Sequence, residues 1–408
     1  MKNLVIVGDG MADFPRADCA GSTPLAVART PAMDRLAREG LTALFCPIPD
    51  AYPAGSDIGN LSLFGYDPAE AFTGRAPLEA ANQAIPMGVN DVVFRCNLVT
   101  LQDGRMKDFT ADHIETKLAH ELINEVNSIV GSATLKFYGG VSYRHLAKVT
   151  TDPHHAHELA ALKCTPPHDI IGRDYEAYLP AGAAADFPRE LMIRSQELLR
   201  DHPLNRARQD SGKLPATSIW LWGQGTAPRL TTYRDRFGID GAVISAVDLV
   251  NGIGRCAGFE VIRVPGATGY LDTNYEGKVA AAIDALSRVD FAYLHIEAPD
   301  EASHEGRLDH KLRAIEDLDR RVVGPCHEFA RAAGDVRILV APDHVTALET
   351  RTHAQGPVPF ILWGPGVRSN GLTRYSEAEA AKAGVLFPAG HELVPAMIER
   401  EVIEFSAA

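Results

Sequence analysis

Short runs of hydrophobic residues, each bounded by polar or glycine positions, recur along the chain and predict strands. Four of these runs cover residues 4–7, 290–296, 337–341 and 359–363. Apolar runs of this length are typical of strands that are buried on both faces. A helical pattern over 30–40 has Thr30 as its expected N-cap and Gly40 as its stop. Strands that alternate with helices predict an α/β fold, with a mostly parallel sheet and helices on both of its faces.

The middle of the chain has a different pattern, in which shorter strands and longer helices follow one another and His, Pro and Arg are frequent. Strands are expected at 92–98, 135–138 and 145–150, and helices at 113–129 and 189–199. We therefore expect an α+β domain, residues 91–215, inserted into a first domain made of 1–90 and 216–408. The His-rich segment 154–157 is expected to be a solvated loop.

The amino-acid composition limits the binding partners and the cellular compartment that we expect for this protein. The 408 residues carry 40 Lys and Arg against 53 Asp and Glu, a net charge of −13, which argues against a broad nucleic-acid-binding face. Six cysteines without a C-x-x-C pair favour reduced thiols in the cytoplasm. No apolar stretch approaches the ~20 residues that span a bilayer, and the apolar run at the N-terminus is too short for a signal peptide. A soluble, cytoplasmic protein is expected; the sequence leaves its oligomeric state open.

Acidic and imidazole side chains follow three of the predicted strands. In open α/β sheets functional groups gather beyond the carboxyl ends of strands, so these side chains are expected to converge. Asp300 and His304 are four residues apart, which places them on one face of a helix. Carboxylate and imidazole ligands suit Zn²⁺, Mn²⁺ or Mg²⁺. The candidate metal ligands are Asp9, Asp300, His304, Asp343, His344 and His353.

Ser56 is the candidate nucleophile. It stands in the segment Gly55-Ser56-Asp57, just before an expected helix whose first N–H groups favour an anion. A serine hydroxyl needs a base or a metal to remove its proton, and two divalent ions about 4 Å apart can do this while they hold phosphoryl oxygens.

Each of these residues taken alone has a structural alternative. Asp9 can cap a turn, His304 can be a solvated helix residue, and Ser56 can be an ordinary N-cap. Asp343-His344 can be a plain loop pair. Residues 223–225 resemble a phosphate loop but lack its lysine, so a P-loop is rejected there. The joint occurrence of the acidic and imidazole groups, each after a strand, favours a functional site.

Taken in order, these motifs resemble the alkaline phosphatase superfamily, and within it the archaeal-type branch of the cofactor-independent phosphoglycerate mutases. The resemblance rests on Asp9, on Gly-Ser56-Asp-x-x-Asn, on Thr-Gly-Arg-Ala-Pro-Leu-Glu-Ala at 73–80, on Asp-x-x-x-His and on Asp-His with a later His. It covers nearly the whole chain. It implies an alkaline-phosphatase-like fold and an isomerase of glycolysis that interconverts 3-phosphoglycerate and 2-phosphoglycerate through a phosphoserine at Ser56, with no bisphosphoglycerate.

The resemblance also implies a ligand set. Asp9, Ser56, Asp343 and His344 would hold one divalent ion, and Asp300, His304 and His353 the other, the metal being Mn, Zn, Mg or Co. The inserted domain would act as a cap that grips a small phosphorylated substrate. Its candidate ligands for phosphate and carboxylate are Arg75, Arg95, Arg144, His145 and Asp152.

Two other functions stay open at this stage. The stretches Gly-Val-Ser-Tyr-Arg-His-Leu at 140–146 and Trp-Leu-Trp-Gly at 220–223 resemble a subset of archaeal-type sequences proposed to act as a homoserine kinase. The second alternative is a non-catalytic metal-binding scaffold protein with the same fold. It stays open because a fold alone does not establish an activity.

Overall fold

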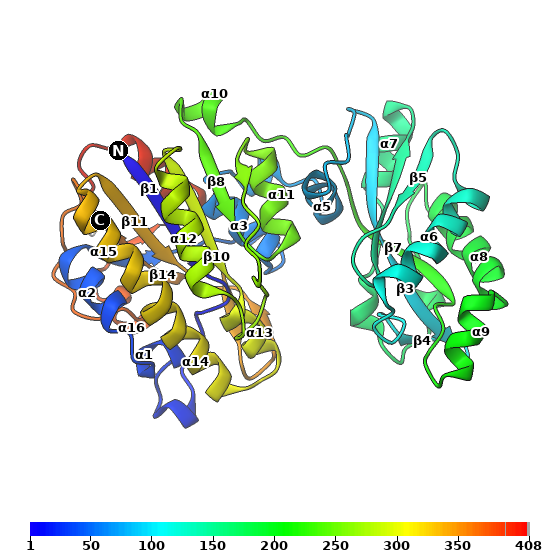
Figure 1. The fold of residues 1–408 in the computed structure, drawn as a ribbon, viewed down its shortest axis with the longest axis horizontal. Coiled ribbons are helices and arrows are strands. Elements are labelled where there is room, and N and C mark those ends of the chain that lie inside the picture. Colours follow the sequence, from blue (N-terminus) through cyan, green and yellow to red (C-terminus); the bar gives the residue numbers. More distant parts are fainter. Residues whose placement is uncertain (388, 406–408) are drawn as a thin grey trace. The chain divides into compact units, whose positions relative to one another are not determined.

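The computed structural model describes residues 1–387 and 389–405 and divides the chain into two compact units. Unit 1 takes in Met1–Phe72 and Leu230–Ala408, and unit 2 takes in Thr73–Arg229 (Figure 1). Unit 2 therefore begins before and ends after the inserted domain that the sequence predicted, residues 91–215. The reason is that helix α5 (Arg75–Asn82) packs on strands β3 (Asp91–Gln102) and β7 (Ser218–Thr226), so both flanking segments belong to the core of unit 2.

An eight-stranded sheet forms the centre of unit 1, in the order β15-β2-β14-β11-β1-β10-β8-β9. Its strands are β1 (Lys2–Gly8), β2 (Leu41–Phe45), β8 (Gly241–Ile244), β9 (Glu260–Val261), β10 (Phe291–Ile296), β11 (Val336–Ala341), β14 (Val358–Trp363) and β15 (Leu386–Phe387). Strand β14 pairs antiparallel with both of its neighbours, and the other pairs are parallel. A mostly parallel sheet is therefore confirmed, with one reversed strand that the sequence pattern did not distinguish.

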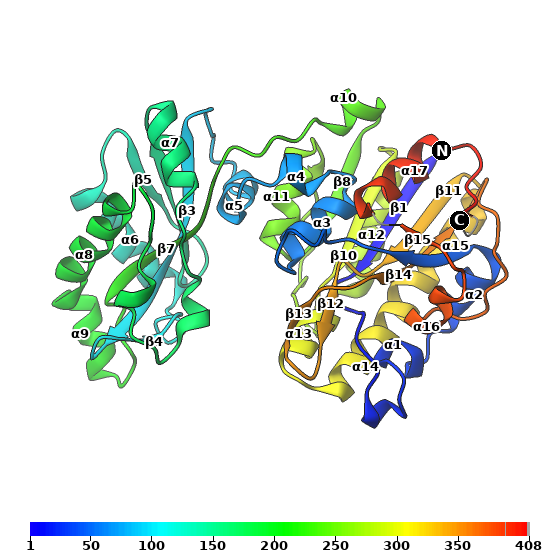
Figure 2. The same ribbon diagram turned by 180° about the vertical axis from the view of Figure 1, so that it is seen from behind.

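Helices cover both faces of this sheet. On one face, α2 (Pro31–Glu39), α12 (Tyr275–Leu286), α14 (Leu308–Leu318) and α15 (Gly324–Ala333) share a buried core with alternate residues of β1, such as Leu4 and Ile6. On the other, α3 (Ser56–Leu63) leads into Phe64, whose ring stacks on Tyr293 of β10 at 3.9 Å. Figures 1 and 2 show the two faces in turn, with α12 and α14 in front in the first and α3 and α17 (Leu393–Glu399) in front in the second.

The remaining elements of unit 1 are short. They are η1 (Ala17–Cys19), α1 (Pro24–Val27), α4 (Pro68–Ala71), α10 (Tyr233–Phe237), α11 (Asp248–Cys256), α13 (Ala298–His304), the π-helical turn η4 (Asp319–Val323), the hairpin of β12 (Val345–Ala347) and β13 (Thr352–Ala354), α16 (Glu377–Ala381) and η5 (Gly390–Glu392).

The start of α2 corrects one expectation. Thr30 occupies the N-cap position, but its side chain makes no capping hydrogen bond. Asp319 of the π-helical turn η4 accepts the backbone N–H groups of Ala32 at 3.1 Å and Met33 at 2.7 Å instead. The predicted N-cap position is thus confirmed, but the capping hydrogen bonds come from a carboxylate almost 290 positions away in sequence, which packing brings to the helix.

Unit 2 is built on an antiparallel sheet in which the long strand β3 pairs with β6 (Arg144–Thr150), β7 and β4 (Arg105–Asp108), and β5 (Leu135–Tyr138) pairs with β6. Its helices are α5, α6 (Thr116–Val130), α7 (Pro153–Ala160), α8 (Asp186–Arg200) and α9 (Pro203–Asp210), with the short turns η2 (Pro167–Ile170) and η3 (Glu176–Tyr178). An α+β architecture is thus confirmed for this unit.

Two local expectations in unit 2 were wrong. The helix expected from 113 begins only at Thr116, because His113 and the two residues before it have positive φ angles. The His-rich segment expected as a loop is helix α7, since Asp152 accepts the N–H groups of His154 and His155 and so starts a helical turn.

None of the helices in the described part of the chain combines the length and the apolar composition that a membrane crossing requires.

Candidate active site

The candidate metal ligands gather at one edge of the sheet in unit 1. Asp9 directly follows β1, Asp343 and His344 follow β11, and Asp300 and His304 lie in α13, which follows β10. These three strands are neighbours in the sheet and run in the same direction, so their carboxyl ends meet. The remaining imidazole, His353, is carried by β13.

One group of ligand atoms is formed by Asp300, His304 and His353. The Nε2 atoms of the two histidines are 3.1 Å apart, and they lie 3.1 and 3.4 Å from the carboxylate oxygens of Asp300. The Nδ1 atom of His304 is 2.9 Å from the carbonyl oxygen of Arg351, to which it can only donate. Nδ1 of His304 therefore carries a proton, so the neutral imidazole would turn the lone pair of Nε2 toward this group, as a metal ligand requires.

A second group surrounds His344. Its Nε2 atom lies 3.3 Å from Asp9 Oδ1, 3.4 Å from Asp343 Oδ2 and 3.0 Å from Ser56 Oγ. The backbone N–H of Gly10 donates to Asp343 Oδ1 at 3.1 Å. All four expected members of this set, Asp9, Ser56, Asp343 and His344, are thus brought together.

Thr346 links the two groups. Its hydroxyl donates to Asp300 Oδ1 at 2.6 Å, and its Oγ1 lies 3.0 Å from His344 Nδ1. Because the hydroxyl proton is used on Asp300, Nδ1 of His344 is the donor, and Nε2 is again left with its lone pair free. The rings of His344 and His353 are 4.2 Å apart between centroids, so the two groups form one continuous cluster.

Ser56 is the first residue of α3, and its hydroxyl contacts His344 instead of capping the helix. Asn60, one turn on, donates to the Ser56 carbonyl oxygen at 2.8 Å and to Asp343 Oδ2 at 2.6 Å. The Tyr293 hydroxyl donates to Asn60 Oδ1 at 2.8 Å, which fixes the orientation of the amide. This close packing requires a glycine at 59, where an added Cβ would lie 2.2 Å from the Asp343 carbonyl oxygen.

The electrostatics of the cluster are dominated by buried negative charge. Asp9, Asp300 and Asp343 have 1%, 4% and 0% of their surface exposed. Burial, and then the charges of Asp343 and Asp300, hold the pKa of Asp9 well above its usual value. A hydrogen bond to Asp300 raises the pKa of His304 to about 9, and the histidines hold the pKa of Asp300 well below its usual value although burial opposes this.

Divalent cations fit this environment. Three buried carboxylates repel one another unless positive charge lies between them, and Asp9 Oδ1 is a buried oxygen with no hydrogen-bond partner among the described residues. Three sets of three donors have atoms within 4.8 Å of one another: Asp300 with His304 and His353, Asp9 with Asp300 and His344, and Asp9 with His295 and Asp343. Mixed oxygen and imidazole donors are the ligands that Zn²⁺, Mn²⁺ and related ions accept.

Three residues of this site were not among the expected site residues: Asn60, which the motif Gly-Ser56-Asp-x-x-Asn already contained, Thr346, and His295, whose Nε2 atom lies 2.9 Å from Asp9 Oδ2. Asn60 had a detectable signal, because it lies four residues after Ser56 and therefore on the same face of the helix. Thr346 and His295 had none, since a threonine in a loop and a histidine inside an apolar strand are common without any functional role.

The candidate substrate ligands belong to unit 2. Glu79 joins Arg75 and Arg95, with N–O distances of 3.4 and 3.1 Å, and the Arg95 guanidinium lies 4.2 Å from the ring centroid of Trp222. Arg144 pairs in register with Asn97, two residues after Arg95, so its side chain projects from the same face of the sheet. Burial lowers the pKa of Arg95 to about 10, and the charges of Arg75 and Arg144 act in the same direction. This face therefore gathers three guanidinium groups.

His145 and Asp152 are placed differently. His145 follows Arg144 in β6 and so lies on the opposite face of the sheet, where its Nδ1 accepts the N–H of Gly140 at 3.1 Å. Burial lowers its pKa to about 3. Asp152 caps helix α7. Neither side chain lies within the cluster formed by Arg75, Arg95 and Arg144.

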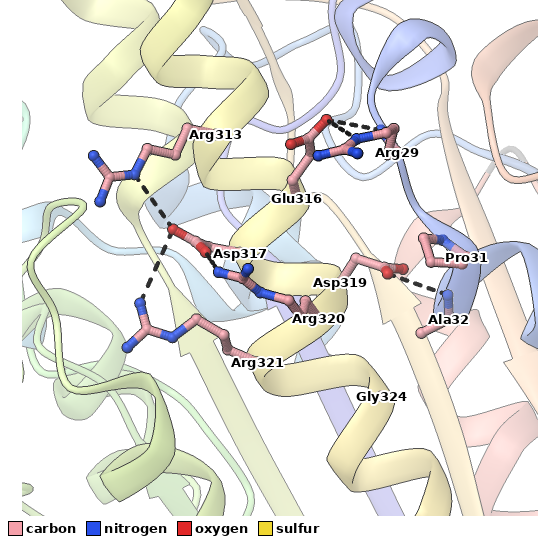
Figure 3. A pocket seen from close by; sticks show the side chains of 10 residues that line it. All are labelled: Arg29, Pro31, Ala32, Arg313, Glu316, Asp317, Asp319, Arg320, Arg321 and Gly324. Atoms are coloured by element: carbon pink, nitrogen blue, oxygen red, sulfur yellow. Dashed lines mark hydrogen bonds and ion pairs between the residues drawn. The ribbon is translucent and has the colours of Figure 1, made fainter.

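A cavity of about 640 Å³ opens elsewhere on unit 1, between the start of α2 and the end of α14 (Figure 3). Its arginines are paired with acidic groups. Arg29 lies 3.5 Å from Glu316, and Asp317 accepts a hydrogen bond from Arg320 at 2.6 Å and forms an ion pair with Arg313 at 3.6 Å. None of the predicted site residues lines this cavity, and its charges compensate one another. The acidic and imidazole cluster is therefore the candidate active site.

Comparison with known proteins decides the family. A family profile described as 2,3-bisphosphoglycerate-independent phosphoglycerate mutase matches residues 37–205. The 2,3-bisphosphoglycerate-independent phosphoglycerate mutase of Methanosarcina barkeri is 49% identical over 387 residues, which are 95% of this chain and 96% of that one. The chain belongs to this mutase family. The resemblance seen in the sequence motifs is thereby confirmed.

Solved structures agree with this mutase assignment. A Pyrococcus horikoshii protein, 31% identical, superposes with a TM-score of 0.82 over 100% of this chain and 99% of that one. The cofactor-independent phosphoglycerate mutase of Thermoplasma acidophilum, 25% identical, gives a TM-score of 0.66 over 98% and 100%. The Methanosarcina barkeri and Thermoplasma acidophilum proteins are both named as mutases, which favours the isomerase over the homoserine kinase alternative.

Proposed function

We propose that this chain interconverts 3-phosphoglycerate and 2-phosphoglycerate by passing the phosphoryl group through Ser56, without a bisphosphoglycerate cofactor. The family supports the reaction. The observation that carries the role of Ser56 is the position of its Oγ atom, 3.0 Å from His344 Nε2 at the edge of a buried cluster of carboxylates and imidazoles. A hydroxyl that merely capped a helix would face backbone N–H groups instead.

Two divalent cations are part of the proposal. Asp9, Ser56, Asp343 and His344 would hold one, and Asp300, His304 and His353 the other. When bound, such ions lower the pKa of a hydroxyl and neutralise phosphoryl oxygens. Because mixed oxygen and imidazole ligands bind Mn, Zn, Mg and Co ions, the proposal specifies a divalent cation from this group and not one element.

The protein's own contribution is to orient the reacting groups. Asn60 holds the Ser56 backbone and the Asp343 carboxylate at a fixed separation, and Tyr293 locks Asn60. The backbone N–H groups at the start of α3 favour a negatively charged phosphoryl group next to Ser56. Phosphoryl transfer needs little beyond such positioning and charge neutralisation.

We assign recognition of the substrate's phosphate and carboxylate to the arginines of unit 2. Arg95 and Arg144 project from one face of its sheet, Arg75 of helix α5 shares Glu79 with Arg95, and a planar guanidinium binds either anion through two hydrogen bonds. Substrate contacts by His145 and Asp152 stay predictions. The six cysteines form no disulfide, which supports work in the reducing cytoplasm, where glycolysis takes place.

The test replaces Ser56 by alanine. Metal-loaded wild type should convert 3-phosphoglycerate in an enolase-coupled assay without added bisphosphoglycerate, and brief incubation with 3-phosphoglycerate should leave a phosphate on Ser56 that mass spectrometry locates. Ser56→Ala should lose both. Ser62→Ala is the matched control, because the Ser62 hydroxyl is buried in the same helix and has no hydrogen-bond partner among the described residues.

Three outcomes contradict the proposal. If Ser56→Ala keeps its turnover, the phosphoserine is wrong. If no turnover appears with Mn²⁺, Mg²⁺, Co²⁺ or Zn²⁺, the mutase activity is wrong. If the chain phosphorylates homoserine with ATP and shows no mutase activity, the kinase alternative holds.

A further inference from the structure

A buried chain of hydrogen bonds leads from Asp9 through His295 to Ser245. His295 Nε2 lies 2.9 Å from Asp9 Oδ2, and His295 Nδ1 lies 3.2 Å from Ser245 Oγ. His295 belongs to β10, and Ser245 directly follows the neighbouring strand β8. The three residues have 1%, 0% and 6% of their surface exposed, so water does not compete for these bonds.

The direction of each hydrogen bond follows from its partners. Ser245 Oγ accepts the backbone N–H of Val247 at 3.0 Å, and in the described part of the chain the acceptor within reach of its own proton is His295 Nδ1. A neutral imidazole that accepts at Nδ1 carries its proton on Nε2. His295 therefore donates from Nε2 to the Asp9 carboxylate.

This arrangement divides the two oxygens of Asp9 between two tasks. Oδ2 receives the hydrogen bond from His295, whereas Oδ1 has no hydrogen-bond partner among the described residues and lies 3.3 Å from His344 Nε2. Rotation of the carboxylate would break the only hydrogen bond that a described residue gives to its side chain. The free oxygen is thus held on the side where Ser56 and His344 lie.

We propose that Ser245 and His295 are positioning residues that orient Asp9, so that Oδ1 is presented to a divalent cation and Oδ2 is withheld from it. This inference rests on the proposed function, because it takes Asp9 as a metal ligand. It also assigns His295 a role outside the ligand set, although His295, Asp9 and Asp343 have donor atoms within 4.8 Å of one another.

The backbone around both residues is anchored, which a positioning role requires. Asn251 of α11 donates to the Ser245 carbonyl oxygen at 3.2 Å. Lys278 of α12, itself fully buried, donates to the His295 carbonyl oxygen at 3.2 Å. Loss of the Ser245 hydroxyl should therefore leave the strands in place, while it frees the imidazole and removes the acceptor of the Val247 N–H. Groups that orient metal ligands in this way typically change metal affinity about 10–100-fold when they are removed.

The first experiment titrates metal-stripped protein with Mn²⁺ by isothermal titration calorimetry. Ser245→Ala should bind one of the two ions about 10–100-fold more weakly and should recover wild-type turnover at saturating Mn²⁺. Ser195→Ala is the matched control, since Ser195 is also fully buried and its Oγ also accepts a backbone N–H, that of Ile219, but it lies in unit 2. Its Mn²⁺ affinity should equal that of the wild type. Equal affinity in Ser245→Ala would overturn the inference.

A second pair of variants separates positioning from ligation. His295→Gln keeps an amide N–H that can donate to Asp9 and should restore most of the affinity that His295→Leu loses, with both ions still bound. If His295→Gln binds one ion fewer than the wild type while its circular dichroism is unchanged, His295 is a ligand and the positioning role is wrong. If wild-type protein binds no divalent ion, the proposed function itself fails, a result distinct from either of these.

Discussion

Replacement of Lys311 should destabilise unit 1 far more than replacement of a surface lysine. Lys311 is fully buried in α14, and its ammonium donates to Asp13 Oδ2 at 2.9 Å and to the carbonyl oxygens of Ala12 at 3.2 Å and Thr346 at 2.7 Å. It therefore ties the loop that follows Asp9 to the segment that follows His344. These two segments carry ligands of the candidate site from different strands.

The magnitude follows from what Lys311→Met leaves behind. The Asp13 carboxylate, with 4% of its surface exposed, would keep the N–H groups of Phe14 and Leu348 but lose its only cation within 4 Å among the described residues. Removal of one partner of a buried ion pair costs about 3–5 kcal/mol, because an uncompensated charge stays in the interior. Lys382→Met is the control. Lys382 pairs with Glu379 at 2.6 Å on the surface, where a pair contributes about 0–1 kcal/mol.

Hydrogen exchange followed by mass spectrometry measures this effect, because it reports on β1 and β11 separately from unit 2 and needs no single unfolding transition. Lys311→Met should lower the free energy of opening of these strands by about 3–5 kcal/mol. The double variant Lys311→Met with Asp13→Asn should recover part of the loss, with a coupling energy of about 1–3 kcal/mol. A loss below about 1 kcal/mol, which is typical of an ion pair on the surface, would refute the idea that this pair is shielded from water and required for stability.

Three further outcomes are expected. Asp319→Ala should lower the free energy of unfolding by about 1–2 kcal/mol, because α2 loses its cap. Thr30→Val should be nearly neutral, because the Thr30 hydroxyl is buried without a partner among the described residues. Urea unfolding followed by circular dichroism compares the two variants. Mn²⁺ at about 100 times its dissociation constant should stabilise the protein against thermal unfolding by about 2.7 kcal/mol. Asp343→Asn should remove most of this stabilisation, and a variant that keeps all of it would exclude Asp343 as a ligand. Arg95→Lys should raise the KM for phosphoglycerate about tenfold, which corresponds to a loss of about 1.4 kcal/mol of binding free energy. The reason is that a lysine cannot both stack on Trp222 and form a planar ion pair with Glu79. The control Arg105→Lys, at an exposed arginine of the same unit, should leave KM unchanged.

The sequence was most informative where the signal is local. The strands before Asp9, Asp300 and Asp343 are mostly apolar and almost fully buried, so both the strands and the polar residues that follow them could be found without a structure. The direction of β14 could not be found, because a buried parallel strand and a buried antiparallel strand have the same pattern.

Features that depend on distant residues were out of reach. The cap of α2 comes from Asp319, and the limits of unit 2 depend on α5 packing against β3 and β7. His295 shows the same limit within the site. In the sequence it is one polar residue inside the apolar strand 291–296, and only the neighbouring strand β8 supplies the Ser245 hydroxyl that gives it a partner.

The division between strands and loops explains how the site can be both charged and buried. The candidate ligand residues Asp9, Asp300 and Asp343 follow β1, β10 and β11, which are adjacent strands with mostly apolar buried residues. Burial of these residues fixes where the carboxylates lie. Mutual repulsion of three buried carboxylates opposes this placement, and bound cations would offset it. A substitution that weakens the apolar packing of these strands should therefore weaken metal binding as well, even where it touches no ligand.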